Sequence, residues 1–169
     1  IVNDNVTASF IVALDKNTGQ EIWRVERAER GQNWATPFVW DNDQRTEIVT
    51  AGTQGVRSYD VDGNLLWEIH GMSGLTIPTP FAKHGLLYIS SGYPGGGLRP
   101  VYVVKPGASG DISIWSEDDM RTGLSSGFPG PKTSSADVAW AYPLLGTYNT
   151  SALVYGDYYY TLLDRGFLV

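Results

Sequence analysis

Few side chains in this sequence stand at spacings that could support chemistry. Two stretches, Asp15-x-Asn17 and Asp60-x-Asp62-Gly63, match the first residues of a calcium-binding loop. Such a loop also needs a bidentate Glu at its twelfth position, and the second stretch has no Glu there. We therefore interpret these acidic residues as turn caps and predict no calcium site.

The other polar candidates do not form catalytic or metal-binding sets either. His70 and His84 lie 14 residues apart, with no third ligand at metal spacing. The chain has no cysteine, which excludes disulfides, thiolate ligands and cysteine nucleophiles. Asp118 and Asp119 are adjacent carboxylates in a stretch rich in Ser and Gly, and no serine has the sequence context of a nucleophile elbow. We predict no catalytic residue and no metal ligand.

Two glycine-rich stretches differ from phosphate-binding loops in a decisive way. In residues 127–133, Pro131 stands directly before Lys132, where a phosphate loop needs a backbone N–H. The glycines at 95–97 precede a predicted strand, whereas a dinucleotide-binding loop opens a helix. The sequence therefore predicts no nucleotide site.

The clearest pattern in the chain is a repeated hairpin. Residues 13–23 and 58–67 each read as a strand, a tight turn and a strand that carries a Trp, and residues 103–115 repeat this more loosely. Asp accepts hydrogen bonds from the turn backbone, and Gly permits a positive φ. The tryptophans lie 44 and then 48 residues apart. We predict that they are largely buried between sheets, and that these residues anchor the repeat: Asp15, Gly19, Trp23, Asp60, Gly63, Trp67 and Trp115.

A second repeated phrase lies between the hairpins. Residues 35–40 match residues 78–83 and, more weakly, residues 150–155. Each is followed by a polar turn and another apolar strand, so two phrases supply four strands. No stretch of the sequence has convincing helical periodicity, and we predict an all-β fold.

Self-similarity at this period, built from short strands, is typical of a β-propeller with one blade per repeat. We predict that residues 1–169 form a partial propeller domain of about three and a half four-stranded blades, as a fragment of a larger propeller. Residues 116–149 depart from the repeat and are predicted to be a loop insertion within that domain. The strand predicted at 158–163 should open a blade that is not completed, so that no ring closes.

The hairpin phrase at residues 13–23 resembles the repeat of the pyrroloquinoline-quinone-like, or quinoprotein-like, β-propeller family. Residues 59–67 and 153–168 fit the same template, and the resemblance covers nearly the whole chain except residues 116–147. The family includes quinone-dependent alcohol and glucose dehydrogenases, the outer-membrane assembly lipoprotein of Gram-negative bacteria, and secreted bacterial propellers of unassigned role. The chain is most similar to the last two groups, which implies a periplasmic or otherwise extracytoplasmic location.

This resemblance implies a non-catalytic module that binds or scaffolds proteins, with outer-membrane protein assembly as one such role. Two alternatives stay open: a fragment of a quinone-dependent dehydrogenase, and the sensor domain of a signalling protein. Dehydrogenases of the alcohol type hold the quinone against an adjacent Cys pair, and this chain has no Cys. We predict no cofactor in this chain.

Charge excludes one class of partner. The net charge is −6, from 12 basic and 18 acidic residues, and no Lys/Arg cluster is present, so we predict no nucleic-acid binding. No apolar run is long enough to predict a transmembrane segment. We expect a protein partner, and a small-molecule ligand is left open.

Two loops break the minimal hairpin pattern and combine small residues with large amphipathic ones. Aromatic and Arg side chains dominate binding hot spots, so we predict the partner surface there. The alternative is that the aromatic residues cap the sheet core. The predicted surface residues are Tyr93, Arg99, Trp140, Tyr142 and Tyr148.

Overall fold

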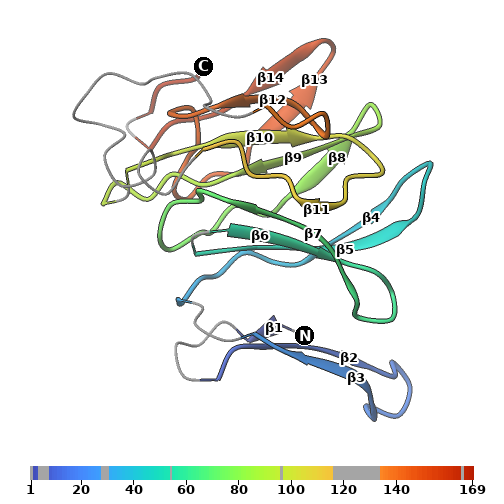
Figure 1. Ribbon diagram of the computed structural model, residues 1–169. Coiled ribbons are helices and arrows are strands. Elements are labelled where there is room, and N and C mark those ends of the chain that lie inside the picture. Colours follow the sequence, from blue (N-terminus) through green and yellow to red (C-terminus); the bar gives the residue numbers. More distant parts are fainter. Residues whose placement is uncertain are drawn as a thin grey trace.

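The computed structural model describes residues 2–3, 8–27, 31–53, 55–95, 97–115, 134–164 and 166–169. Within these ranges every regular element is a β-strand and none is a helix, which confirms the all-β prediction. The strands form four sheets that stack in chain order from the N-terminal to the C-terminal sheet (Figure 1). No sheet closes into a barrel among the described residues.

The first sheet has the order β1-β2-β3, formed by Val2–Asn3, Phe10–Leu14 and Glu21–Glu26. The turn between β2 and β3 is capped by Asp15, whose carboxylate accepts hydrogen bonds from backbone N–H groups two and three residues further on. Gly19 closes the turn with a φ of 73°. A short polar side chain and a glycine are what a tight turn of this type requires.

The second sheet is the largest and has the order β11-β7-β6-β5-β4. Its four antiparallel strands are β4 (Phe38–Asp41), β5 (Thr46–Gly52), β6 (Gly55–Tyr59) and β7 (Leu65–His70). The fifth strand, β11 (Gly110–Asp111), comes from the third predicted hairpin and pairs in parallel with β7. This pairing covers the edge of β7, which would otherwise present unpaired backbone groups.

The third sheet has the order β12-β10-β9-β8. Its strands are β8 (Phe81–Lys83), β9 (Leu86–Ser90), β10 (Val101–Val104) and β12 (Val138–Tyr142). The prediction that residues 116–149 are a loop is therefore wrong for β12, because these five residues pair with β10 along its length. Residues 116–133 lie outside the described part of the chain.

The last sheet is a hairpin of β13 (Leu153–Tyr155) and β14 (Tyr158–Tyr160). The strand predicted at 158–163 is thus shorter than expected, and Leu162 forms only an isolated bridge, with Leu168. Backbone hydrogen bonds between Thr161 and Val169 close a second hairpin.

One structural device recurs in the first three sheets. In each, one strand of an antiparallel pair carries one extra, unpaired residue near the end of the pairing. The residue that follows it on the same strand is a Trp, which is paired with the neighbouring strand. Such a bulge bends the strand and re-aims the side chain beside it. The three pairs are Ala13 with Trp23, Ser58 with Trp67, and Val103 with Trp140.

This corrects the prediction that Trp115 is the third anchor of the repeat, because Trp140 holds the equivalent position. In the third hairpin the backbone N–H of Lys105 donates to the carbonyl of Asp137 at 2.8 Å, so a long insertion lies inside the turn. Trp115 belongs to that insertion and lies outside the strands. It is buried and packs against Tyr102, with ring centroids 5.0 Å apart.

The main hydrophobic core lies between the second and third sheets. It is formed by alternate residues of their central strands together with the segment that carries Trp115. Burial of each such aliphatic or aromatic side chain contributes on the order of 1.5–3 kcal/mol. Its largest members include Trp40, Trp67, Ile69, Leu87, Ile89, Tyr102, Ile112 and Trp115.

A carboxylate with no solvent exposure lies within the second sheet. Glu47 accepts four hydrogen bonds: from Asn42 Nδ2 and Arg45 Nε, both at 3.1 Å, from Ser58 Oγ at 2.6 Å and from Trp67 Nε1 at 2.7 Å. A buried charge is tolerated only when its lone pairs are used in this way. Arg45 also donates to the carbonyl of Ala108, which connects this cluster to the segment after β10.

The first and second sheets are joined by Trp23. Its indole N–H donates to the carbonyl of Val61 at 2.8 Å, and its ring lies over the turn at Gly63. A Cβ atom built on Gly63 would lie 3.0 Å from the indole ring, so a side chain there would force the ring to shift by a few tenths of an ångström. Buried Arg27 makes a second link, through Ser9 Oγ at 3.2 Å and Thr50 Oγ1 at 3.4 Å.

We predict that Glu47→Ala lowers the free energy of unfolding by about 3–5 kcal/mol, because it leaves buried donors unpaired. Glu68→Ala is the matched control, since Glu68 is a partly exposed strand residue in an ion pair with Arg57. The control should cost about 1 kcal/mol or less. Urea denaturation of both variants measures the difference, and equal losses would contradict the role given to the Glu47 cluster.

We also predict that Gly63→Ala is more destabilising than Gly19→Ala. Both glycines have a positive φ, 88° and 73°, so both substitutions cost about 1–2 kcal/mol in backbone strain. Only at Gly63 does the added Cβ meet the ring of Trp23, whereas the space around Gly19 is open. Thermal unfolding should show a further loss of about 1–2 kcal/mol at Gly63. The same melting temperature for both variants would mean that Trp23 is not packed there.

Candidate functional site

The connections between strands gather at two opposite ends of the stack. The tight turns of the β2–β3, β4–β5, β6–β7, β8–β9 and β13–β14 hairpins lie at the right in Figure 1. The connections from β7 to β8 and from β9 to β10 lie at the opposite end. We call the second end the loop end; it comprises the described parts of residues 31–37, 71–80, 91–100 and 143–150. Loops of this kind, held by a rigid scaffold, are where binding residues concentrate.

Three of the predicted surface residues lie at the loop end. The rings of Tyr93 and Tyr148 are in contact, with centroids 5.3 Å apart and planes at 60°. Arg99 lies in the same loop as Tyr93, and its backbone bonds with two residues of the other loop, Pro143 at 2.9 Å and Gly146 at 2.7 Å. The structure thus brings together residues that lie more than 40 positions apart in the sequence.

The loop end is fixed by backbone contacts. The backbone N–H of Tyr93 donates to Ser73 Oγ at 3.0 Å, and that of Tyr148 donates to Asp164 Oδ2 at 3.0 Å. Gly92 and Gly146 pack so closely that a Cβ atom on either would overlap the backbone of the other loop. The loops that carry the side chains at this end are therefore held in place by hydrogen bonds and by close packing of their backbones.

The other two predicted surface residues lie on β12. Trp140 is 38% exposed and packs edge-on against Tyr88 and Tyr159, with ring centroids 6.3 and 5.8 Å apart. It therefore occupies the space between the third and last sheets. Tyr142 is 57% exposed, at the end of β12 where the chain enters the loop end.

Sequence reasoning missed Trp34 at the loop end. This side chain is 57% exposed, and its backbone N–H donates to the carbonyl of Thr76 in the loop between β7 and β8. The sequence did contain a signal for it: Trp34 does not follow the spacing of the hairpin tryptophans, so the repeat gives it no packing role.

The anchor residues Asp15 and Asp60 act as turn caps, as interpreted from the sequence. Hydrogen bonds from the backbone N–H and hydroxyl of Thr18 lower the pKa of Asp15. The side-chain amide of Asn64 donates to Asp60 at 2.8 Å and is the main cause of its lowered pKa. Both carboxylates are thus used in local turns.

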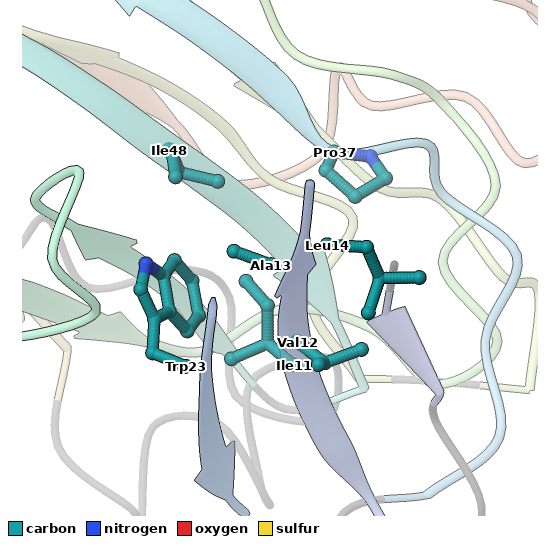
Figure 2. A pocket seen from close by; sticks show the side chains of 7 residues that line it. All are labelled: Ile11, Val12, Ala13, Leu14, Trp23, Pro37 and Ile48. Carbon is teal, nitrogen blue, oxygen red and sulfur yellow. The ribbon is translucent and has the colours of Figure 1, made fainter. Parts of the chain in front are cut away.

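Two pockets lie between neighbouring sheets. Each lies beside one of the bulge tryptophans, the name that we give to Trp23, Trp67 and Trp140, which follow the three β-bulges. The first, of about 330 Å³, separates the first and second sheets and has an apolar lining (Figure 2). Figure 2 shows Trp23 on one side of this space and Pro37 and Ile48 on the other. Residues of β2 complete the lining: Ile11, Val12, Ala13 and Leu14.

The second pocket, of about 340 Å³, lies between the third and last sheets. Its lining is aromatic and polar: His84, Tyr88, Trp140, Val154, Gly156, Asp157, Tyr158 and Tyr159. Sequence analysis proposed only Trp140 of these as a binding residue. The others belong to the β8–β9 and β13–β14 hairpins, which come together only because the third and last sheets stack on each other.

In the described ranges, no group of three or more His, Cys, Asp or Glu side chains is arranged to hold a metal ion. Asp118, Asp119 and Lys132 lie outside those ranges. The described residues also contain no helix long and apolar enough to cross a membrane. No protein-family model and no curated protein matches the chain.

We predict a loss of stability in alkali that depends on Tyr159. Burial raises the pKa of Tyr159 to about 12, whereas an unfolded tyrosine titrates near 10. The neutral side chain therefore stabilises the fold fully below pH 10, and this contribution, about 2 kcal/mol, is lost as the pH rises through 12.

Urea denaturation between pH 9 and about 12 measures this effect. Tyr159→Phe should flatten the decline relative to wild type, whereas Tyr155→Phe, at a tyrosine that is 77% exposed, should follow wild type. Some decline should remain in Tyr159→Phe because burial also raises the pKa of Tyr102. Identical curves for all three proteins would contradict the burial of Tyr159.

Proposed function

We propose that the four sheets are successive blades of a propeller of the pyrroloquinoline-quinone-like type. Support comes from the bulge that recurs in three sheets, each time beside a Trp on the last antiparallel strand of the sheet. The stacking of the sheets in chain order also fits one blade per repeat (Figure 1).

We further propose that the chain is a protein-binding or scaffolding module, and that the loop end is its binding surface. The observation that carries this proposal is the contact between the rings of Tyr93 and Tyr148, in two loops that backbone hydrogen bonds of Arg99 hold together. Because the two loops pack closely backbone to backbone, their backbone loses little conformational freedom when a partner binds. Aromatic and Arg side chains on such a surface are the residue types that dominate binding energy.

The partner that fits this surface is an extended protein segment. Tyr93, Tyr148 and exposed Trp34 offer apolar faces to its side chains, and Arg99 can pair with a carboxylate. An extracytoplasmic location, with a role such as outer-membrane protein assembly, follows from the sequence resemblance and is part of the proposal. The proposal involves no catalytic residue and no cofactor.

Selection from a displayed library of extended peptides tests this function. We expect bound peptides that share aromatic and acidic residues, with binding weakened about tenfold or more by Arg99→Gln or Tyr93→Ala. The control is Tyr155→Ala, at an exposed tyrosine of the β13–β14 hairpin. Melting temperatures separate lost binding from lost folding. Peptides whose binding survives both loop-end substitutions would contradict the proposed surface.

A further inference from the structure

The pocket between the third and last sheets differs in chemistry from its counterpart between the first two sheets. Both lie beside a bulge tryptophan, Trp140 and Trp23. The counterpart is lined by aliphatic side chains, proline and one indole. The pocket beside Trp140 has four aromatic residues, a histidine and an aspartate, so it has polar groups that could fix the orientation of a ligand.

The aromatic side chains form a continuous wall. Tyr88 stacks on Phe81 and on Tyr159, with centroids 5.0 and 5.9 Å apart and planes within 20° of parallel. Trp140 meets Tyr88 and Tyr159 edge-on. Tyr158, which is 68% exposed, extends the lining toward solvent. Because Tyr88 is stacked between other rings, the aromatic surface left for a ligand belongs mainly to Tyr158 and to Trp140, which is 38% exposed.

Two polar side chains stand at the mouth of the pocket on neighbouring hairpin turns. His84 Nε2 lies 3.2 Å from the carbonyl of Gly156, a contact that ties the β8–β9 turn to the β13–β14 turn. Asp157 follows Gly156 directly and makes no ion pair within the described part of the chain. Because the Nε2–H group of His84 faces the carbonyl of Gly156, its Nδ1 atom remains as an acceptor. Nδ1 and the carboxylate of Asp157 can both accept hydrogen bonds from hydroxyl groups of a ligand.

We propose that this pocket binds a pyranose ring of a neutral saccharide. The C–H face of a pyranose carries a partial positive charge that suits the aromatic wall, and its hydroxyl groups suit His84 and Asp157. The volume, about 340 Å³, falls within the range of small-molecule sites. The lining of the pocket includes residues of the β8–β9 and β13–β14 turns, which lie at the end of the stack opposite the loop end (Figure 1). Saccharide binding here is therefore separate from the protein binding proposed for the loop end.

Two other ligand classes fit the pocket less well. An anion would meet the carboxylate of Asp157 on a chain of net charge −6. A quaternary ammonium ion needs rings arranged around a central space, whereas Tyr88, Trp140 and Tyr159 contact one another and leave none between them.

The test uses the whole chain titrated with cellobiose, maltose and diacetylchitobiose, followed by ligand-observed NMR and calorimetry. We expect at least one of these sugars to bind with a dissociation constant of about 1 mM or lower. Tyr158→Ala and Asp157→Asn should each weaken that binding about fivefold or more. Tyr155→Ala is the matched control for the first variant because Tyr155 is the exposed cross-strand partner of Tyr158 and does not line the pocket. Asp62→Asn, in an exposed turn, is the control for the second.

Three results would overturn the proposal. One is the absence of saturable binding for all three sugars. Another is binding that Tyr155→Ala weakens as much as Tyr158→Ala, because this would place the sugar elsewhere on the hairpin. Tetramethylammonium is titrated as a competing probe, and tighter binding of this cation than of any sugar would also contradict the proposal. Arg99→Gln should leave sugar binding unchanged, which keeps this test distinct from that of the loop end.

Discussion

The arrangement of the sheets depends on the bulge that precedes the tryptophans of β3, β7 and β12. Side chains alternate between the two faces of a regular strand, and one extra residue re-aims the side chain beside it. The indole must then satisfy its N–H group wherever it is placed. The indole N–H of Trp23 donates to the carbonyl of Val61 in the neighbouring sheet. The indole N–H of Trp67 donates to Glu47 within its own sheet. The same backbone device therefore produces both a link between sheets and a polar centre inside one.

This difference explains where the structure is most firmly packed. The buried carboxylate of Glu47 accepts the hydrogen bond of the Trp67 indole N–H. The indole can therefore be fully buried in the core between the second and third sheets. The last sheet has no such centre, and Trp140 there packs among tyrosines beside an open pocket. Incomplete packing at that boundary creates the space that we assign to a ligand.

The sequence pattern predicted the strands and turns well because each depends on local chemistry, such as Asp15 and Gly19 in the first turn. It failed in the third hairpin, where an insertion carries Trp115 at nearly the spacing expected for the repeat. Only strand pairing reveals that Trp140 is the equivalent residue. Glu47 was missed for a similar reason, since a charged residue within a strand usually faces solvent, and its donors come from three other places in the chain.

The central claim is that consecutive sheets dock through their tryptophans, and hydrogen exchange of the indole N–H groups tests it most directly. In NMR spectra of the native protein, the Trp23 indole should exchange slowly because it is bonded to Val61 between two sheets. The Trp67 indole, bonded to buried Glu47, provides the internal reference for protection. Slow exchange at both positions is the result that this account predicts. Exchange of Trp23 at the rate of an unstructured peptide, with Trp67 still protected, would contradict it.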